Sequence, residues 1–403
     1  MDKAFWKAGH PPTVFAAFLY FDLSFMVWVL LGPMAVQIAP DLGLSAAQKG
    51  LMVATPLLAG AVLRMVMGVL VDHLKPKRAG VIGQVIVIAA LFVAWQLGIH
   101  NFNQVLLLAV FLGVAGASFA VALPLASRWY PPQYQGTAMG IAGAGNSGTA
   151  LAALFAPTLA QWYGWNAVFG LALIPLLLAL CVYLWLAKDS PDCPAPKSLA
   201  QYLEVLQDKD AWWFMFFYCV TFGGFSGLAS SLSLYFHDQY GFAAVQAGLY
   251  TALCVFAGSL MRPIGGTVAD KVGGIRALLI LYTLAAWCLG LVALNPPAAW
   301  MAIAALVGGM LCLGMGNGAV FQLVPQRFRK EIGVMTGLVG MAGGIGGFLL
   351  ASGLGLSKQT TGNYGLGFAI FASLGLVAWV GLLSVKRRWR TTWGALQVSG
   401  ARV

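Results

Sequence analysis

The sequence predicts an all-helical protein that crosses a lipid bilayer many times. Hydrophobic residues make up 60% of its 403 residues and charged residues only 9%, whereas a soluble domain is about half apolar and about a quarter charged. The mean hydropathy is correspondingly high, at +0.83. Apolar runs of about 20 residues, the length of helix that spans a bilayer, recur along nearly the whole chain.

Twelve of these runs are long enough to be transmembrane helices. An even number places both chain ends on the same side of the membrane. The polar N-terminal stretch leads directly into an apolar run that is too long for a signal peptide, so we expect no cleavage there. The segments are predicted at 13–39, 47–72, 79–98, 104–129, 135–163, 166–187, 211–237, 246–271, 277–294, 298–326, 332–354 and 363–386.

Basic residues lie mainly in alternate loops, which indicates the orientation of the chain. The other loops hold little beyond Lys49 and Lys358. Cytoplasmic loops are enriched in Lys and Arg, so we expect both chain ends in the cytoplasm, as in a bacterial-type inner membrane. Topology therefore explains the net charge of +11, and we expect no nucleic-acid partner. The basic residues of the alternate loops and the tail are Lys75, Lys77, Arg78, Arg128, Lys188, Lys197, Lys209, Lys271, Arg276, Arg327, Arg329, Lys330, Lys386, Arg387, Arg388 and Arg390.

The cysteines and histidines are not spaced for a metal site, a cofactor or a disulfide framework. The six cysteines are scattered without a C-x-x-C pair, and the four histidines lie at predicted helix ends or in loops. Paired acids, clustered histidines and an activated serine are also missing from membrane depth. The sequence therefore predicts neither a metal, nor a cofactor, nor an enzyme.

The chain contains one internal repeat. "LAGAVLRMVMGVLVD" (58–72) aligns with "FAGSLMRPIGGTVAD" (256–270), and an Arg and an Asp occupy the same places in both copies. Two six-helix halves at 1–187 and 211–403 follow from this repeat, joined by a polar linker at 188–210. Parallel halves with a binding site between them are typical of transporters.

Three charged residues stand deep inside predicted helices: Arg64 and Arg262 at repeated positions, and Asp22. Buried intramembrane charges are costly and mark functional sites. An internal salt bridge is the structural alternative, but a single Asp cannot neutralise two arginines. We therefore predict that an anionic substrate supplies the counter-charge. The guanidinium group is a planar fork of donors, which suits a small planar anion.

Two predicted helices are unusually rich in glycine, at 136–157 and 333–355. Close helix packing explains part of this pattern. It does not explain Asn146, because a buried amide costs free energy unless it is hydrogen-bonded, and this amide could donate to an anion. The glycines of this signature are Gly140, Gly143, Gly145, Gly337, Gly340, Gly343 and Gly344.

A family resemblance rests on these motifs. "GVLVDHLKPKR" (68–78) and "GTVADKVGGIR" (266–276) resemble the loop motif of the major facilitator superfamily, although Lys75 stands where glycine is usual. Within that superfamily, the arginine pair with "AGAGNSGT" and "GMAGGIGG" is similar to the nitrate/nitrite porter family. The resemblance covers essentially the whole chain. It implies the major facilitator fold, which consists of two pseudo-symmetric six-helix bundles that alternate in access.

The resemblance also implies a substrate site. Arg64 and Arg262 would bind nitrate or nitrite, Phe119 and Phe321 would sandwich it, and Tyr218 would hydrogen-bond to it. Phe119 and Phe321 taken alone are more typical of core residues. Asn146 matches the signature asparagine, whereas the second signature has Gly343 at the aligned position. A charged latch at one membrane face is implied for Asp72, Arg78, Asp270 and Arg276.

The coupling mechanism stays open between two alternatives. Proton symport needs an acid within the membrane, and Asp22 is the one deep candidate, so the sequence favours nitrate/H⁺ symport for uptake. Exchange of nitrate for nitrite moves no net charge and needs no acid, and Asp22 would then be a packing residue. A porter for another small organic anion is a further alternative, and a passive channel would not need the repeated arginines. One chain holds both halves, so we expect the protein to function as a monomer in the bilayer.

Overall fold

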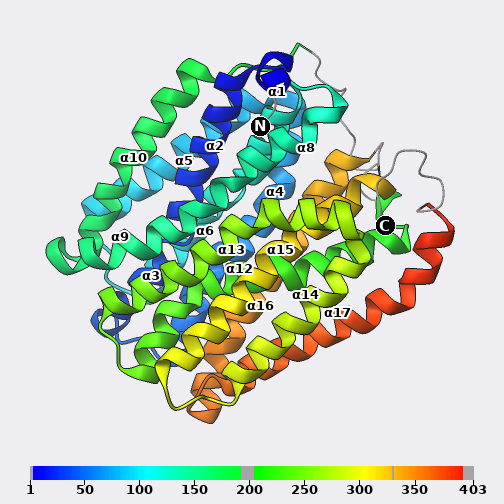
Figure 1. Ribbon diagram of the computed structural model, residues 1–403. Coiled ribbons are helices and arrows are strands. Elements are labelled where there is room, and N and C mark those ends of the chain that lie inside the picture. Colours follow the sequence, from blue (N-terminus) through cyan, green and yellow to red (C-terminus); the bar gives the residue numbers. More distant parts are fainter. Residues whose placement is uncertain (1–2, 192–203, 329–330, 394–403) are drawn as a thin grey trace.

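The computed structural model describes residues 3–191, 204–328 and 331–393, and these residues form helices and no strands (Figure 1). The predicted linker, 188–210, therefore lies mostly outside the described residues. Eleven helical stretches are long and apolar enough to cross a membrane. They match eleven of the twelve predicted segments, and the all-helical membrane fold is thereby confirmed.

The remaining predicted segment, 135–163, is a broken crossing. It consists of α8 Pro132–Gly143, the 3₁₀ turn η1 Ala144–Ser147 and α9 Gly148–Tyr163, each shorter than a span. The break falls on the glycine–asparagine signature. Three of the six residues at 143–148 are Gly, which is a poor helix former and so favours a turn here over a continuous helix. The signature therefore interrupts the helix locally, and does not only allow neighbouring helices to pack closely.

The first half contains two more breaks. Its first crossing divides into α2 and α3, and its fourth divides into α6 and α7. The helices of this half, besides α8, η1 and α9, are α1 Lys3–Ala8, α2 Pro11–Trp28, α3 Leu31–Asp41, α4 Ala46–Leu74, α5 Pro76–Leu97, α6 Phe102–Gly116, α7 Phe119–Ser127 and α10 Trp165–Leu186.

The crossings of the second half are continuous helices. A Pro lies inside α13 and α15 without dividing either helix. The six helices are α12 Lys209–Tyr240, α13 Ala244–Val272, α14 Gly274–Ala293, α15 Ala299–Arg327, α16 Ile332–Thr361 and α17 Gly365–Thr391. The two halves thus share a repeat in sequence but differ in whether their crossings are divided into shorter helices.

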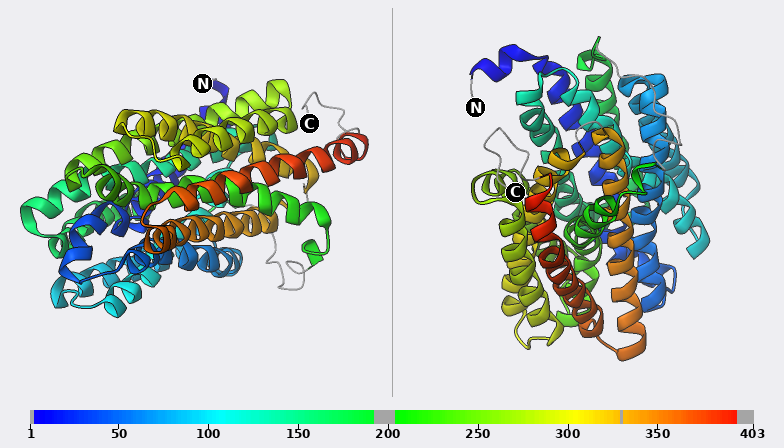
Figure 2. Two further views of the ribbon diagram at one scale, coloured as in Figure 1. Left: turned by 90° about the horizontal axis from the view of Figure 1, so that it is seen from below. Right: turned by 90° about the vertical axis from the view of Figure 1, so that its right-hand side faces the viewer.

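The halves meet along two equivalent seams. In the first, α4 packs against α16, and in the second, α9 packs against α13. These are the second and eleventh crossings and the fifth and eighth crossings, so exchanging the halves exchanges the seams. Figure 2 shows from two sides that helices of both halves run side by side through the length of the bundle, with α16 (orange) beside α4 (blue).

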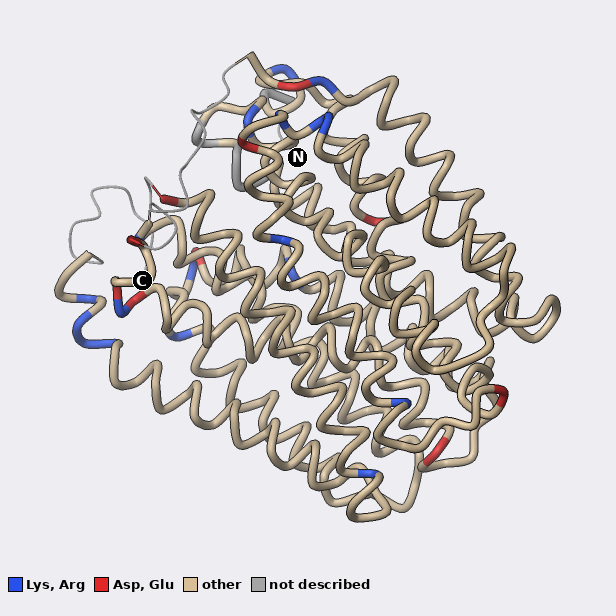
Figure 3. Tube along the Cα trace, turned by 180° about the vertical axis from the view of Figure 1, so that it is seen from behind, with Lys and Arg blue, Asp and Glu red and all other residues tan. Residues whose placement is uncertain are grey.

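We name the two ends of the bundle by the chain segments found there. The terminal face carries both ends of the described chain, and the opposite face carries the loops at 42–45, 241–243 and 362–364. Figure 3 shows most charged residues gathered at the terminal face, with few at the opposite face. This distribution is the one that the alternate basic loops predict.

The first seam is tight at the opposite face and loose at the terminal face. A methyl carbon built on Gly355 of α16 would lie 2.6 Å from the Cα of Gly50 on α4, too close for any real side chain. On Gly340 it would lie 3.6 Å from the Cδ of Arg64, an ordinary contact. On Gly337, one turn further, it would meet nothing within 4 Å. The helices therefore separate beyond Arg64.

The second seam shows the same gradient. A methyl carbon on Gly248 of α13 would lie 2.7 Å from Pro157 of α9. On Gly143 it would lie 3.9 Å from Arg262, and on Gly140 it would meet nothing within 4 Å. In both seams the helices are thus in close contact toward the opposite face and farther apart toward the terminal face. Arg64 and Arg262 lie where close contact ends in each seam.

Candidate functional site

Arg64 lies on α4 at the middle of the first seam and is 1% exposed. Its Nε donates to the carbonyl oxygen of Gly116 at 3.0 Å, and its Nη1 donates to that of Gly340 at 2.5 Å. Gly116 is the last residue of α6, where carbonyl groups lack partners within the helix. The break between α6 and α7 therefore supplies the acceptor that fixes this arginine.

Aromatic rings surround the Arg64 guanidinium. Its Cζ lies 5.9 Å from the ring centroid of Phe25, 5.2 Å from Trp28, 5.4 Å from Phe119 and 5.1 Å from Phe222. A desolvated cation–π contact contributes about 2 kcal/mol. Rings and carbonyls together offset the cost of burying the charge, and neither involves an acid.

Arg262 occupies the matching place on α13 but is only half-buried. Its Cζ lies 5.7 Å from the ring centroid of Phe119 and 5.6 Å from that of Phe321. The Tyr218 hydroxyl lies beside this guanidinium, without a well-aligned hydrogen bond to it. Phe119 thus borders both arginines, one from each half.

Each arginine reaches the glycine signature of the other half. Arg64 bonds to Gly340 of α16, and Arg262 lies against Gly143 at the end of α8. These two glycines occupy equivalent positions in the repeat. A side chain at either position would contact the arginine of the other half, which gives these signature glycines a role beyond helix packing.

The predicted aromatic residues form a connected cluster around the arginines. Phe119 and Phe321 contact each other edge to face at 6.2 Å between centroids, and Tyr218 meets Phe321 edge to face at 5.0 Å. Tyr218 also stacks on Phe222 at 5.1 Å. Ring edges carry partial positive charge, so these rings can attract an anion beside the guanidinium groups.

Gly343 explains why the second signature lacks an asparagine. A methyl carbon at this position would lie 2.8 Å from the rings of both Tyr218 and Phe222. The place that Asn146 holds in the first half is therefore filled in the second half by an aromatic ring from α12. The polar partner of the second half is Tyr218 instead of an amide.

Several donors and one acceptor of this cluster have no partner among the described residues. Arg64 Nη2 and Arg262 Nη1 are buried N–H donors without an acceptor, and the Asn146 Oδ1 is a buried acceptor without a donor. Neither arginine forms an ion pair with a described acid. Buried polar groups are normally satisfied, so the cluster is chemically suited to an anion that accepts from both guanidinium groups.

Among the described residues, Asp22 forms no ion pair or hydrogen bond with Arg64 or Arg262. It is 6% exposed and accepts a hydrogen bond from Ser147 Oγ at 2.6 Å and one from the backbone N–H of Gly148. Gly148 is the first residue of α9, and a carboxylate is favoured at a helix N-terminus. Asp22 therefore holds the break that carries Asn146.

The break is also touched from the other half. Ser259 of α13 donates to the carbonyl oxygen of Asn146 at 3.4 Å, and Thr149 donates to the same oxygen at 2.7 Å. Ser259 lies three residues before Arg262, so it shares a face of α13 with that arginine. Asp22, the break and Arg262 are thus joined through short contacts.

The four predicted latch residues lie at the terminal face, where the seams are loose. Asp72 pairs with Arg128 at 3.2 Å, and both belong to the first half. Arg78, Asp270 and Arg276 are exposed. Among the ion pairs between described residues, none at this face joins the two halves. The latch stays a prediction for a state in which this face is closed.

Sequence reasoning missed the residues that position Arg64. Trp28 and Phe222 flank the guanidinium, and the acceptors are backbone carbonyls, which carry no sequence signal of their own. Trp28 had one indirect signal in the sequence, the glycines at positions 60 and 116 that face it. Its indole fills the space beside Gly60 and Gly116, where a methyl carbon on Gly60 would lie 2.9 Å from the indole nitrogen.

The fold and the site together define a membrane transport protein and not an enzyme. Two repeated halves enclose a charged cluster at the middle of the bundle, and the seams between them widen toward one face, as in transporters that work by alternating access. The sequence matches the Major Facilitator Superfamily over residues 15–351. The chain belongs to this family.

Relatives of known name cover nearly the whole chain. It is 32% identical to the probable nitrate/nitrite transporter NarK2 of Mycobacterium tuberculosis, across 88% of this chain and 91% of that protein. It is 31% identical to the probable nitrate transporter NarT of Staphylococcus carnosus, across 91% and 94%. It is 30% identical to the nitrite extrusion protein of Bacillus subtilis, across 89% and 90%.

Proposed function

We propose that this protein transports nitrate and nitrite across a bacterial-type inner membrane, with the anion held between Arg64 and Arg262. The observation that carries this proposal is the pair of guanidinium groups, one buried and one half-buried, that border the Phe119 ring from the two halves without a described acid. A bidentate anion would accept from Arg64 Nη2 and Arg262 Nη1 at once. The names of the relatives supply the identity of the anion.

The surroundings favour a small planar anion. Phe119 and Phe321 contact each other beside the arginines, Tyr218 offers a hydroxyl donor, and Gly143 and Gly340 bring backbone instead of side chains to the site. Apolar walls exclude water and so strengthen the contacts to the guanidinium groups. A bulky anion would collide with these rings.

The clamp also explains how binding drives alternating access. Arg64 and Arg262 belong to different halves and carry like charges, so an anion between them favours their approach. With the terminal face in the cytoplasm, as the basic loops predict, the described state is open to the cytoplasm. Closing that face would bring the latch residues Asp72, Arg78, Asp270 and Arg276 toward the opposite half.

For coupling, we propose nitrate/H⁺ symport through Asp22. This residue accepts from Ser147 and Gly148 at the break that carries Asn146, so a change in its protonation would alter the contacts that place the signature amide. Inward movement of an anion against a negative-inside potential costs about 2.3 kcal/mol per charge per 100 mV. Cotransport of more than one H⁺ would supply this free energy.

Nitrate/nitrite exchange is the second candidate, and the repulsion between the arginines favours it. A transporter that cannot close without an anion between Arg64 and Arg262 returns only when it is loaded, which is the requirement for exchange. Asp22 would then serve only to hold the break. Export of nitrite in return for nitrate moves no net charge.

Nitrate accumulation in proteoliposomes tests both the substrate and the coupling. The monomeric protein is reconstituted with an imposed pH gradient, and each assay is repeated with nitrite inside. Uptake with the pH gradient alone supports symport, and Asp22→Asn should then abolish it. Uptake only with internal nitrite establishes exchange. No nitrate movement in either case would contradict the nitrate assignment, and competition by small carboxylates would then point to an organic anion.

A further inference from the structure

The opposite face contains one ion pair that joins the halves. Lys49 on α4 lies 3.7 Å from the carboxylate of Asp238, two residues before the end of α12. None of the other ion pairs between described residues joins the halves: Asp72–Arg128 lies in the first half, and the others tie Arg327 and Arg388 to acids at the end of the linker. Lys49–Asp238 is therefore placed where a charge contact can control the separation of the halves.

A tyrosine and a second lysine complete this cluster. The Tyr364 hydroxyl donates to the other carboxylate oxygen of Asp238 at 2.8 Å, and Lys358 Nζ lies 5.5 Å from the centroid of the Tyr364 ring. Tyr364 is 4% exposed. Lys49 and Lys358 are the two Lys or Arg residues that the sequence places on this side of the membrane. Lys49 lies beside Asp238, and Lys358 lies beside the Tyr364 ring.

A second polar contact lies beside the ion pair. The backbone N–H of Ala47, in the first turn of α4, donates to the side-chain oxygen of Gln359 on α16 at 3.3 Å. The first N–H groups of a helix have no partner within it, so the second half provides an acceptor for the first. Both contacts would be lost if α4 moved away from α12 and α16.

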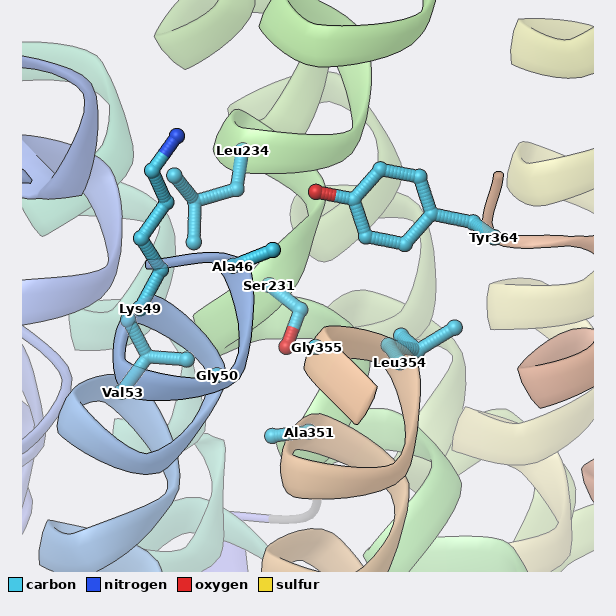
Figure 4. Close-up of a pocket in the computed structure, with 10 residues that line it drawn as sticks. All are labelled: Ala46, Lys49, Gly50, Val53, Ser231, Leu234, Ala351, Leu354, Gly355 and Tyr364. Atoms are coloured by element: carbon cyan, nitrogen blue, oxygen red, sulfur yellow. The ribbon is translucent and has the colours of Figure 1, made fainter. Parts of the chain in front are cut away.

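Beneath these contacts the passage between the halves is nearly filled. Figure 4 shows Lys49 and Gly50 on one side, Gly355 and Tyr364 on the other, and Ser231 between them. The remaining cavity has room for about 10 Å³, about the space of one water molecule. Gly50 and Gly355 touch through their backbones. An anion cannot pass this point unless the halves separate.

We propose that Lys49 and Asp238 form a latch that holds the opposite face closed and releases it in each transport cycle. Their side chains are 24% and 12% exposed, so both charges gain full hydration as the face opens. A partly exposed pair therefore costs little to break. A fully buried pair would leave charges unpaired in an apolar seam and trap the closed state. The latch resists opening without preventing it.

Accessibility of Ser231→Cys from the opposite face tests this proposal without requiring nitrate as the substrate. The full chain in oriented vesicles is exposed to a membrane-impermeant maleimide, and labelling is counted above that of the chain without the new cysteine. Lys49→Gln and Asp238→Asn should each raise the labelling rate about two- to fivefold, the range expected for losing a partly exposed ion pair. The exchanged pair, Lys49→Asp with Asp238→Lys, should return the rate toward that of Ser231→Cys alone.

Asp41→Asn is the matched control, because Asp41 is an acid at the same face whose partner, Trp165 at 2.6 Å, belongs to its own half. This variant should leave labelling unchanged. Gel filtration of each variant confirms that the chain is folded. Unchanged labelling in both single variants, an equal rise in Asp41→Asn, or no recovery in the exchanged pair would each overturn the latch. If the unmodified chain does not transport nitrate, the proposed function is contradicted. The labelling result, which does not depend on nitrate, still tests the latch.

Discussion

Arg64 and Arg262 occupy the same place in the sequence repeat, yet they differ in burial and in the groups that surround them. Arg64 is 1% exposed, donates to two carbonyl groups and lies among four aromatic rings. Arg262 is half-buried, with two rings and a tyrosine hydroxyl beside it. The difference originates in the neighbouring crossing, which is broken after Gly116 in the first half and continuous as α15 in the second.

This comparison indicates a division of roles. A carbonyl freed by the helix break fixes Arg64 as a rigid wall of the site. No break supplies an equivalent acceptor to Arg262, so that guanidinium is available to follow the anion as the halves move. We therefore expect substitutions at Arg64 to affect both stability and transport, and substitutions at Arg262 to affect transport alone.

The largest effect is expected for Arg64→Lys. Lysine keeps the charge but cannot donate to both Gly116 and Gly340 while also binding an anion. Two hydrogen bonds from a charged group are lost, so nitrate uptake should fall by about 100-fold or more, and the thermal unfolding midpoint should fall as well. Uptake and thermal unfolding are measured on the same preparation, with the exposed Arg387→Lys as control.

Arg262→Lys should also reduce nitrate uptake strongly, by about 10- to 100-fold, because the planar fork is lost. The thermal midpoint should stay close to that of the unmodified chain, because no described carbonyl depends on this guanidinium. A midpoint that falls as far as in Arg64→Lys would contradict the division of roles. Near-normal uptake by either lysine variant would contradict the clamp itself.

Glycine-to-alanine substitutions along α16 test the difference between the two ends of the seam. A methyl carbon at Gly344 would lie 2.7 Å from the Cβ of Ala61, so Gly344→Ala should destabilise the closed face by about 1–3 kcal/mol. Gly337 meets nothing within 4 Å, so Gly337→Ala should leave the unfolding midpoint unchanged. Equal midpoints for the two variants would mean that the seam is equally open along its length.

The smallest effect is expected for Tyr218→Phe, which removes one hydroxyl donor beside Arg262. The KM for nitrate should rise about two- to tenfold, as for the loss of one neutral hydrogen bond, with a smaller change in maximal rate. Tyr282→Phe is the matched control, because its hydroxyl donates to the carbonyl of Phe217 within the second half, at 2.9 Å. That variant should not raise KM, and a similar rise would show that Tyr218 acts only through packing.

Much of the architecture follows from the sequence because it depends on local pattern. The length of apolar runs predicts the crossings, alternate basic loops predict the distribution of charge at the two faces, and the repeated arginines predict a site that both halves share. The scarcity of deep acids is equally a property of composition. It predicts that neither arginine has a permanent counter-charge, and no described acid pairs with Arg64 or Arg262.

Only the tertiary structure decided which groups replace the missing acid and which face is closed. The acceptors of Arg64 lie 52 and 276 residues away and are backbone carbonyls, identical in every residue and therefore invisible in a sequence. The contact of Asp22 with the break depends on how α2 packs against η1. The closed face, with Lys49 against Asp238, depends on contacts between residues that are far apart in the sequence, so no local pattern could fix it.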